Sequence, residues 1–147
     1  MKPKGERPKG LIDSGAILAL VDETDQWHEV CDRELDSLSF PLATTTAVLC
    51  ELFHFIKEKP VLLEAAWEVL RSGAVTVLPL SDEDLIGIEV LMARYQDRPM
   101  DFADATLVHL ARRENLKTIF TTDHNDFETY RIKGKSAFRV RPPRQGQ

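Results

Sequence analysis

Short apolar runs alternate along this chain with longer segments of helical periodicity, and this alternation constrains the fold more than any other feature. The first run, Gly10–Ile12, ends at an acid, and further strands are expected at 40–43, 75–78, 117–121 and 137–140. Strands that are joined through helices pair side by side in parallel. The sequence therefore predicts an α/β fold with a short, mostly parallel sheet of four to five strands, flanked by helices on both faces.

Start and stop residues mark several of the helices. Pro60 suits a first helical position and Gly73 suits the residue after a last one. Ser81, with Asp84 three residues later, resembles a capping box. Helices are expected over 14–21, 24–38, 46–58, 60–72, 81–95 and 101–114, with a short helical turn at 126–130.

Charge is distributed unevenly along the chain. Its 147 residues suit one domain and carry a net charge of −5. Residues 1–10 and 131–147 together contain ten of the 19 basic residues and one of the 24 acidic ones. We expect a flexible basic arm at 1–9, a folded domain over 10–141 and a basic tail at 142–147. The basic ends could hold a phosphate backbone beside a cation-binding centre, or simply keep the ends dissolved.

Membrane proteins and secreted mini-proteins are excluded by the composition. The longest apolar stretches, such as 16–21, fall far short of a membrane span, and the basic start lacks the apolar segment of a secretory signal. Cys31 and Cys50 form neither a CxxC pair nor a disulfide framework, which indicates a reducing compartment. The expected location is the cytoplasm, without membrane contact and without a structural zinc ribbon.

Two acids follow predicted strands and two others lie on predicted helices. Asp13 and Asp123 come after the first and fourth runs, where parallel sheets gather their functional residues. Each could instead do no more than cap the helix that follows. Glu51 shares a helical face with apolar residues near the middle of its helix, which is costly for an uncompensated carboxylate. Asp104 also lies on an apolar stripe, although Asp101 three residues earlier makes a capping role equally natural.

Four carboxylates gathered at one end of a sheet would repel each other unless a divalent cation bound them. A site with oxygen ligands alone favours a hard ion, Mg²⁺ or Mn²⁺. Such ions readily take phosphate oxygens as further ligands and activate water for attack on a phosphodiester. The residues alone thus indicate metal-dependent phosphoryl chemistry on a nucleic acid.

The acidic motifs resemble those of the PIN-domain ribonucleases. The matching segments are Leu11-Ile12-Asp13-Ser14-Gly15, Thr44-Thr45-Thr46 leading to Glu51, Met100-Asp101-Phe102-Ala103-Asp104-Ala105, and Phe120-Thr121-Thr122-Asp123 with Asp126-Phe127. The likeness covers residues 10–141 and is strongest to the small group that contains the VapC toxins. It implies a three-layer PIN-like fold, Mg²⁺- or Mn²⁺-dependent endonucleolytic cleavage of RNA, a homodimer, and a small antitoxin that blocks the site.

The resemblance also assigns roles to individual positions. Asp13, Glu51, Asp104 and Asp123 match the catalytic, metal-binding acids of the family. Thr121 and Thr122 stand where the family has a hydroxyl that hydrogen-bonds the carboxylates. Asp101 is interpreted mainly as a helix cap and Asp126 as a neighbour of the anchoring Phe127, with an auxiliary role for either acid left open.

Other interpretations remain open at this point. A phosphatase of the haloacid dehalogenase type also has an acid after its first strand, but it needs a second Asp where Gly15 stands. A non-toxin PIN nuclease or a non-catalytic RNA-binding module would share the same motifs. Trp27 and Trp67 suit helix packing or a dimer face better than base stacking. His124 is expected in a loop, and the basic tail residues are the candidates for contact with the RNA backbone.

Overall fold

The sheet of the computed structural model, which describes residues 6–145, has five parallel strands in the order β3-β2-β1-β4-β5. Each strand has three residues: β1 (Gly10–Ile12), β2 (Leu42–Thr44), β3 (Val75–Val77), β4 (Thr118–Phe120) and β5 (Arg139–Arg141). All of the neighbouring pairs are parallel. The prediction of a short parallel sheet is confirmed. Because β1 lies at the centre, the chain runs to one edge through β2 and β3 and to the other edge through β4 and β5.

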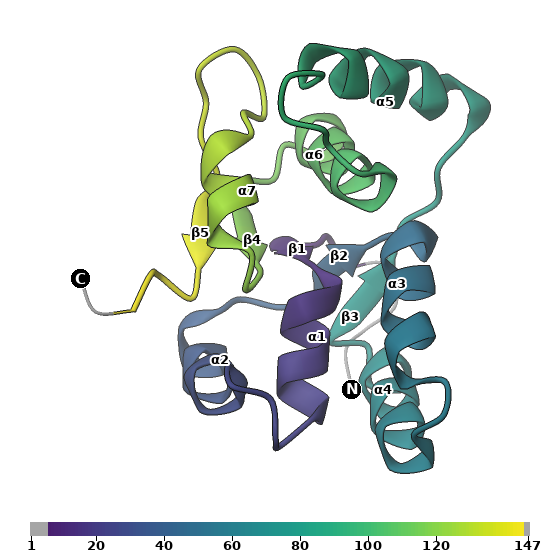
Figure 1. The fold of residues 1–147 in the computed structure, drawn as a ribbon, viewed down its shortest axis with the longest axis vertical. Coiled ribbons are helices and arrows are strands. Elements are labelled where there is room, and N and C mark those ends of the chain that lie inside the picture. Colours follow the sequence, from purple (N-terminus) through teal and green to yellow (C-terminus); the bar gives the residue numbers. More distant parts are fainter. Residues whose placement is uncertain (1–5, 146–147) are drawn as a thin grey trace.

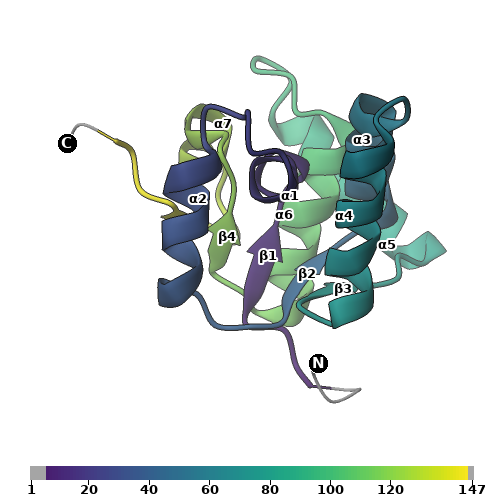
Figure 2. The ribbon, with the colours of Figure 1, turned by 90° about the horizontal axis from the view of Figure 1, so that it is seen from below.

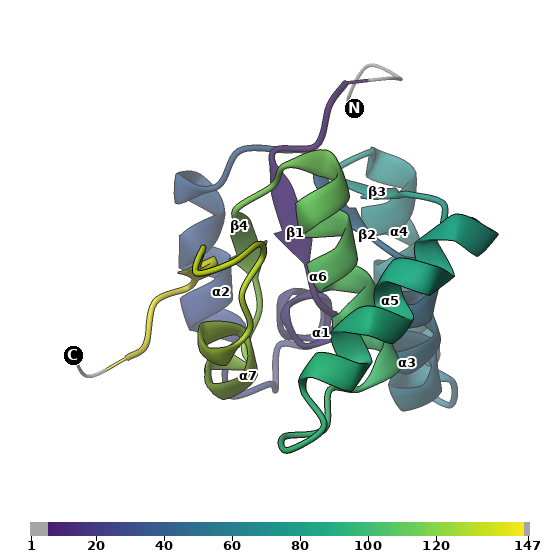
Figure 3. The ribbon, with the colours of Figure 1, turned by 90° about the horizontal axis from the view of Figure 1, so that it is seen from above.

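Helices cover both faces of the sheet and give three layers (Figure 1). Seen from below, the nearer helices include α1 (Ser14–Val21), α2 (His28–Glu34) and α4 (Pro60–Ser72) (Figure 2). Seen from above, they are α5 (Asp82–Arg94), α6 (Phe102–Glu114) and α7 (His124–Thr129) (Figure 3). Helix α3 (Thr46–Ile56) lies at the β3 side of the sheet and contributes buried residues to both layers.

Two apolar cores hold the layers together. One core, between the sheet and α5, α6 and α7, includes Leu107, Ile119 and Phe127. The other, between the sheet and α1, α3 and α4, includes Ile17 and Leu52. The α6 helix is buried along most of its length, since eight of its residues are shielded from solvent. The burial of α6 fixes the position of its first turn over the end of the sheet.

The helix caps follow the predicted residues closely. Ser81 and Asp84 form the expected capping box at the start of α5. Gly73 ends α4 with a φ of 83°, and Asn115 ends α6 with a φ of 55°. Both residues take the left-handed conformation that terminates helices and that Gly and Asn tolerate best. Local sequence signals therefore set most of the helix boundaries.

One predicted helix is wrong in extent. The segment 24–38 does not form a single helix; α2 begins at His28 and is followed by a short 3₁₀ helix, η1 (Leu35–Ser37). The side chain of Asp25 accepts a hydrogen bond from the backbone N–H of Trp27 at 2.8 Å, and Asp22 accepts one from Thr24. These bonds stabilise turns instead of capping a helix. Smaller differences remain: β2 and β5 begin two residues later and end one residue later than expected, and α7 begins at His124.

The two ends of the described chain contact the folded body. Lys9 donates its backbone N–H to the Pro41 carbonyl at 2.8 Å. Beyond the last strand, Pro142 is buried and its carbonyl accepts a bond of 2.7 Å from the His124 ring. The first five residues of the expected basic arm and the last two of the expected tail lie outside the described residues. Between residues 6 and 145, no helix is long and apolar enough to cross a membrane.

Candidate active site

The acids singled out in the sequence come from four different elements. Asp13 follows β1 and Asp123 follows β4, and these two strands are paired neighbours. Asp104 lies in the first turn of α6, and Glu51 lies near the middle of α3. Asp13 and Asp104 are buried, whereas Glu51 and Asp123 are half-buried. The central position of β1 thus brings residues about a hundred positions apart to one end of the sheet.

The tightest group of carboxylates comprises Asp104, Asp123 and Asp126, whose nearest oxygens all lie within 4.8 Å of one another. The sequence predicted the first two members of this group, while the role of Asp126 was left open. The side chain of Asp123 also caps α7 by accepting from the Asp126 backbone N–H at 3.1 Å. Asp123 can therefore both cap α7 and belong to the cluster, because its carboxylate has two oxygens.

Asp13 is joined to this group through a threonine. Its Oδ2 accepts a bond of 3.1 Å from the Thr121 hydroxyl, and the same hydroxyl oxygen accepts the Asp123 backbone N–H at 3.0 Å. The other oxygen of Asp13 accepts the Ser14 backbone N–H at 2.7 Å. Thr121 therefore holds the two acids that follow β1 and β4 in a fixed relationship, as the resemblance implied for a threonine here.

Glu51 stands at the edge of the cluster. Its Oε1 accepts a bond of 3.2 Å from the Ser14 hydroxyl, and Ser14 is the neighbour of Asp13. The helical face predicted to surround Glu51 comprises Ala47, Val48, Leu52 and Phe55, and it is wrong for Phe55, which is 63% exposed. The buried stripe of α3 instead runs through Val48, Leu52 and Ile56. Glu51 consequently lies at the margin of that stripe, with its carboxylate facing the same end of the sheet as Asp13.

Burial and mutual repulsion shift the acids toward their neutral forms. Burial raises the pKa of Asp104 to about 8, and the negative charges of Asp13 and Asp101 add to the shift. Burial likewise raises the pKa of Asp13 to about 6, with further contributions from Glu51 and Asp123. Such a group of carboxylates is costly to ionise without a cation.

Burial is also the main cause of the raised pKa of the two half-buried acids. For Glu51, the nearby charge of Asp101 raises the pKa further. For Asp123, the charge of Asp126 acts in the same direction, whereas the Arg98 guanidinium opposes it. All four acids of the predicted set are therefore harder to ionise in the folded protein than in free peptides.

Neutral groups provide the hydrogen bonds to the four predicted acids. Among residues 6–145, no Lys or Arg side chain forms an ion pair with any of these four. The nearest ion pair joins Arg98 to Asp126 at 2.9 Å, and the same guanidinium donates to the Thr129 hydroxyl. Within the described residues, no Lys or Arg side chain therefore neutralises the four predicted acids.

Tyr130 is a member of the site that the sequence did not predict. Its hydroxyl donates a bond of 2.9 Å to Asp104 Oδ2 in the protein interior. The ring packs edge-on against Tyr95 and Phe127, which fixes its position. Asp104 and Tyr130 are 26 residues apart and no local pattern connects them. Only the packing of α7 against α6 could reveal this contact.

Asp101 fulfils its expected role as a helix cap. Its Oδ1 accepts the Asp104 backbone N–H at 2.8 Å at the start of α6. Asp101 also lines an open pocket of about 350 Å³ together with Glu51, Cys50 and Phe102. Its charge reaches both Glu51 and Asp104, as their raised pKa values indicate. Asp101 therefore lies beside the cluster without joining the tightest group.

One expectation about the surroundings of the site needs correction. His124 is not a loop residue, because it is buried at the start of α7 and bonds the Pro142 carbonyl. Two of the basic tail residues are engaged by acids of the body: Arg141 pairs with Glu34, and Arg144 pairs with Glu128 at 2.7 Å. These arginines are consequently not mobile cations, and the tail is held against α2 and α7.

The donor set fits a hard divalent cation. Within the described residues, the group whose oxygens converge within 4.8 Å is Asp104, Asp123 and Asp126, and it contains no thiol. Asp13 and Glu51 add carboxylates beside this group without belonging to it. A set of oxygen ligands suits Mg²⁺ or Mn²⁺ over softer metals. The buried hydroxyls of Thr121 and Tyr130 orient two of these carboxylates. Outer groups of this kind are usual around metal ligands. The arrangement can bind a cation and, through it, a phosphate group.

Several known proteins resemble this chain in sequence and in fold. Ribonuclease VapC26 of Mycobacterium tuberculosis (strain ATCC 25618 / H37Rv) is 30% identical over 142 residues, which cover 90% of this chain and 99% of the relative. The crystal structure of M. tuberculosis VapC20, described as a sarcin–ricin loop cleaving toxin, superposes with a TM-score of 0.69 at 19% identity and covers 78% of this chain and 90% of that one.

Two further structures share the fold at lower identity. A toxin–antitoxin complex from Klebsiella pneumoniae gives a TM-score of 0.65 at 14% identity, with 84% of this chain and 93% of that chain covered. VapBC2 from Rickettsia felis, bound to a DNA fragment from its promoter, gives a TM-score of 0.65 at 14% identity, with 88% of this chain and 96% of that chain covered. The model of the PIN domain matches residues 10–133. The chain therefore belongs to the PIN-domain family, and the resemblance to its VapC-like group that the motifs indicated is confirmed.

Proposed function

We propose that this protein is a metal-dependent endoribonuclease that hydrolyses RNA phosphodiester bonds, and that it is the toxin of a toxin–antitoxin pair. The observation that carries the proposal is the carboxylate cluster: three acids have oxygens within 4.8 Å of one another, and Asp13 is tied to them through Thr121. The 30% identity to Ribonuclease VapC26 over almost its full length supports the same activity.

We assign the metal ligands to Asp13, Glu51, Asp104 and Asp123. A bound Mg²⁺ or Mn²⁺ would activate a water molecule and stabilise negative charge on the cleaved phosphate. The protein contributes a fixed set of oxygens, since Thr121 orients Asp13 and Tyr130 orients Asp104. Glu51 completes the set from the margin of α3, where the Ser14 hydroxyl holds its carboxylate. The Arg98 guanidinium neutralises part of the negative charge of Asp126.

The proposal includes two protein partners, an antitoxin and a second copy of this chain. The similar structures from Klebsiella and Rickettsia are complexes or pairs with an antitoxin, which supports a small antitoxin that covers this acidic site. Exposed apolar side chains on α3 and α4, Phe55, Val61 and Trp67, support a homodimer. Cys31 and Cys50 are both free thiols, which is consistent with a cytoplasmic location.

The phosphatase alternative is disfavoured by the space around Gly15. A Cβ atom at this position would lie 2.6 Å from the Thr122 hydroxyl oxygen. An aspartate at position 15 would therefore require the Thr122 side chain to move. Membership of the PIN-domain family excludes the alternative independently.

The decisive experiment measures cleavage of RNA by the purified protein with Mn²⁺ and with EDTA. We expect cleavage with Mn²⁺ and no cleavage with EDTA. We expect Asp13→Asn and Asp104→Asn to reduce the cleavage rate at least about 100-fold, because each substitution removes a metal ligand. Asp82→Asn is the matched control, because Asp82 is an exposed acid in the first turn of α5. Full activity of the two site variants would overturn the assignment, and binding without cleavage would favour a non-catalytic RNA-binding module.

A further inference from the structure

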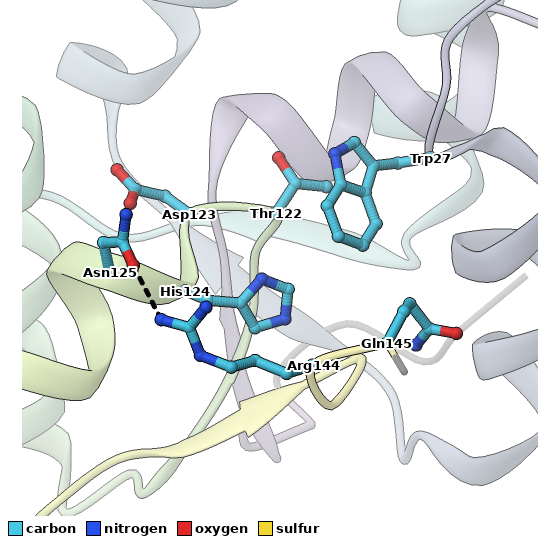
Figure 4. Close-up of a pocket in the computed structure, with 7 residues that line it drawn as sticks. All are labelled: Trp27, Thr122, Asp123, His124, Asn125, Arg144 and Gln145. Carbon is cyan, nitrogen blue, oxygen red and sulfur yellow. Dashed lines mark hydrogen bonds between the residues drawn. The ribbon is translucent and has the colours of Figure 1, made fainter. Parts of the chain in front are cut away.

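We propose that an open pocket next to the acidic cluster binds one nucleotide of the RNA beside the cleaved bond. This inference deepens the proposed nuclease function and rests on it. The pocket has a volume of about 330 Å³, at the small end of the range for ligand sites. It is lined by Trp27, Thr122, Asp123, His124, Asn125 and Arg144, with Gln145 at its margin (Figure 4).

The pocket is continuous with the cluster through the segment that follows β4. Asp123 lines the pocket and is also one of the three acids whose oxygens converge within 4.8 Å. Thr122 precedes it, and Thr121 before that bonds Asp13. An RNA strand whose phosphate lies at the cluster therefore has its next nucleotide within reach of the pocket, because successive nucleotides are joined through that phosphate.

Trp27 offers an aromatic surface for a base. The packing that the sequence indicated for this residue is confirmed, because the indole packs against the core that includes Ile17 and Leu52. The indole is only half-buried and also lines the pocket. Its ring centre lies 5.3 Å from that of His124, at an interplanar angle of 40°. His124 is fixed in turn by its bond of 2.7 Å to the Pro142 carbonyl. The indole is thus held in place before any base arrives, which favours stacking of any of the four bases.

Arg144 provides the positive charge that a phosphate or sugar needs beside so many acids. Its guanidinium donates to Asn125 Oδ1 at 2.6 Å and to Glu128 Oε1 at 2.7 Å, and Figure 4 shows it reaching across the pocket. Nη1 of Arg144 has no hydrogen-bond partner within residues 6–145. A guanidinium held in this way is well suited to bind a phosphate oxygen. The combination of a fixed aromatic ring and a fixed cation favours a nucleotide over a peptide.

The test uses the two tryptophans of the chain as reporters. Trp67→Phe leaves Trp27 as the one remaining tryptophan, and Trp27→Phe leaves Trp67 of α4, which packs against Phe53 of α3. Each variant is titrated with single-stranded RNA of mixed sequence, about ten nucleotides long, with Ca²⁺ in place of Mn²⁺. Anisotropy of labelled RNA reports binding independently. We expect quenching of Trp27 emission as the RNA saturates the protein, and no change in Trp67 emission.

Kinetics with Mn²⁺ test the same pocket without relying on fluorescence. We expect Trp27→Ala and Arg144→Gln to lower kcat/KM for RNA about 10-fold or more, and Asp82→Asn, at an exposed acid of α5, to leave it unchanged. Mn²⁺ affinity, measured by calorimetry, should stay at the wild-type value in all three variants. Trp27→Phe retains an aromatic ring and should recover most of the activity even if the alanine variant folds poorly.

The outcomes separate the subsite from the nuclease function. If the wild-type protein cleaves RNA while RNA binding leaves Trp27 emission unchanged, the subsite is wrong and the nuclease stands. If RNA quenches Trp27 but no RNA is cleaved with any metal, the pocket stands and the nuclease falls. A response of Trp27 to an antitoxin peptide and not to RNA would assign the pocket to a protein partner and overturn the proposal.

Discussion

The hydroxyl of Tyr130 donates a hydrogen bond of 2.9 Å to Oδ2 of Asp104, between α7 and α6 in the protein interior. This bond favours the charged carboxylate, which is the form that binds metal, against the burial that raises the pKa of Asp104. Tyr130→Phe should therefore weaken Mn²⁺ binding about 10-fold or more, as calorimetry would show. Tyr95→Phe is the control, since the Tyr95 hydroxyl accepts a bond from the Arg131 backbone N–H and, within residues 6–145, bonds no acid. Equal Mn²⁺ affinity in both variants would remove Tyr130 from the site.

The carboxylate cluster predicts an unusual dependence of stability on pH. Burial raises the pKa of Asp104 to about 8 and that of Asp13 to about 6, whereas an unfolded Asp titrates near about 3.9. The native state therefore holds more protons than the unfolded state between these values. The protonated side chains of Asp104 and Asp13 therefore make their full contribution to stability below about pH 4, and this contribution is lost as the pH rises to about 8.

Urea unfolding in EDTA at pH 5 and pH 8 tests this dependence. The free energy of unfolding should be lower at pH 8, and Asp104→Asn should raise it there by about 1–3 kcal/mol because the amide has no charge to lose. Asp82→Asn should behave as the wild type does. Mn²⁺ added at pH 8 should restore stability to the wild-type protein. A wild-type protein equally stable at both pH values would contradict the repulsion inferred for the cluster.

Thr121 should matter through its hydroxyl alone. It donates to Asp13 Oδ2 and accepts the Asp123 backbone N–H, so Thr121→Val removes both bonds at similar volume. We expect a loss of RNA cleavage of about 10- to 100-fold, together with weaker Mn²⁺ binding. Thr121→Ser keeps the hydroxyl and should keep most of the activity. If the valine and serine variants cleave RNA equally, Thr121 contributes only to packing.

Thr44 offers a stability test away from the acids. It is fully buried at the end of β2, and its hydroxyl has no hydrogen-bond partner in the part of the chain that the structure describes. Thr44→Val should leave stability unchanged or raise it by about 1 kcal/mol, since a buried unpaired hydroxyl is costly. Thr106→Val is the matched contrast, because Thr106 bonds the Ala103 carbonyl at 2.6 Å and should lose about 1–2 kcal/mol. Thermal unfolding compares the two, and a large loss in Thr44→Val would reveal a partner for its hydroxyl.

Much of the fold could be predicted because its signals are local. The capping pair Ser81 and Asp84 and the stop residues Gly73 and Asn115 each act within a few positions of the chain. The positions of Asp13 and Asp123 followed from the rule that the loops after parallel strands meet at one edge. That inference needed only the alternation of short apolar runs, predicted as strands, with predicted helices.

The parts of the site that escaped prediction depend on contacts between distant side chains. Tyr130 reaches Asp104 because α7 packs against α6, and Arg98 reaches Asp126 from the loop after α5. Hydrophobic periodicity describes which face of an element is buried, but it does not say which residue of a neighbouring element that face meets. The turn before α2 was missed for a similar reason, since Asp25 bonds Trp27 in a turn that competes with a longer helix.

The central place of β1 in the sheet has a consequence for the timing of biosynthesis. β1 is synthesised long before one of its two neighbours, β4, which comprises residues 118–120. The bond between Asp13 and Thr121 spans 108 positions, so it forms only after most of the chain has been translated. The carboxylates of Asp13 and Asp123 therefore cannot be brought together until β4 has been synthesised and has paired with β1.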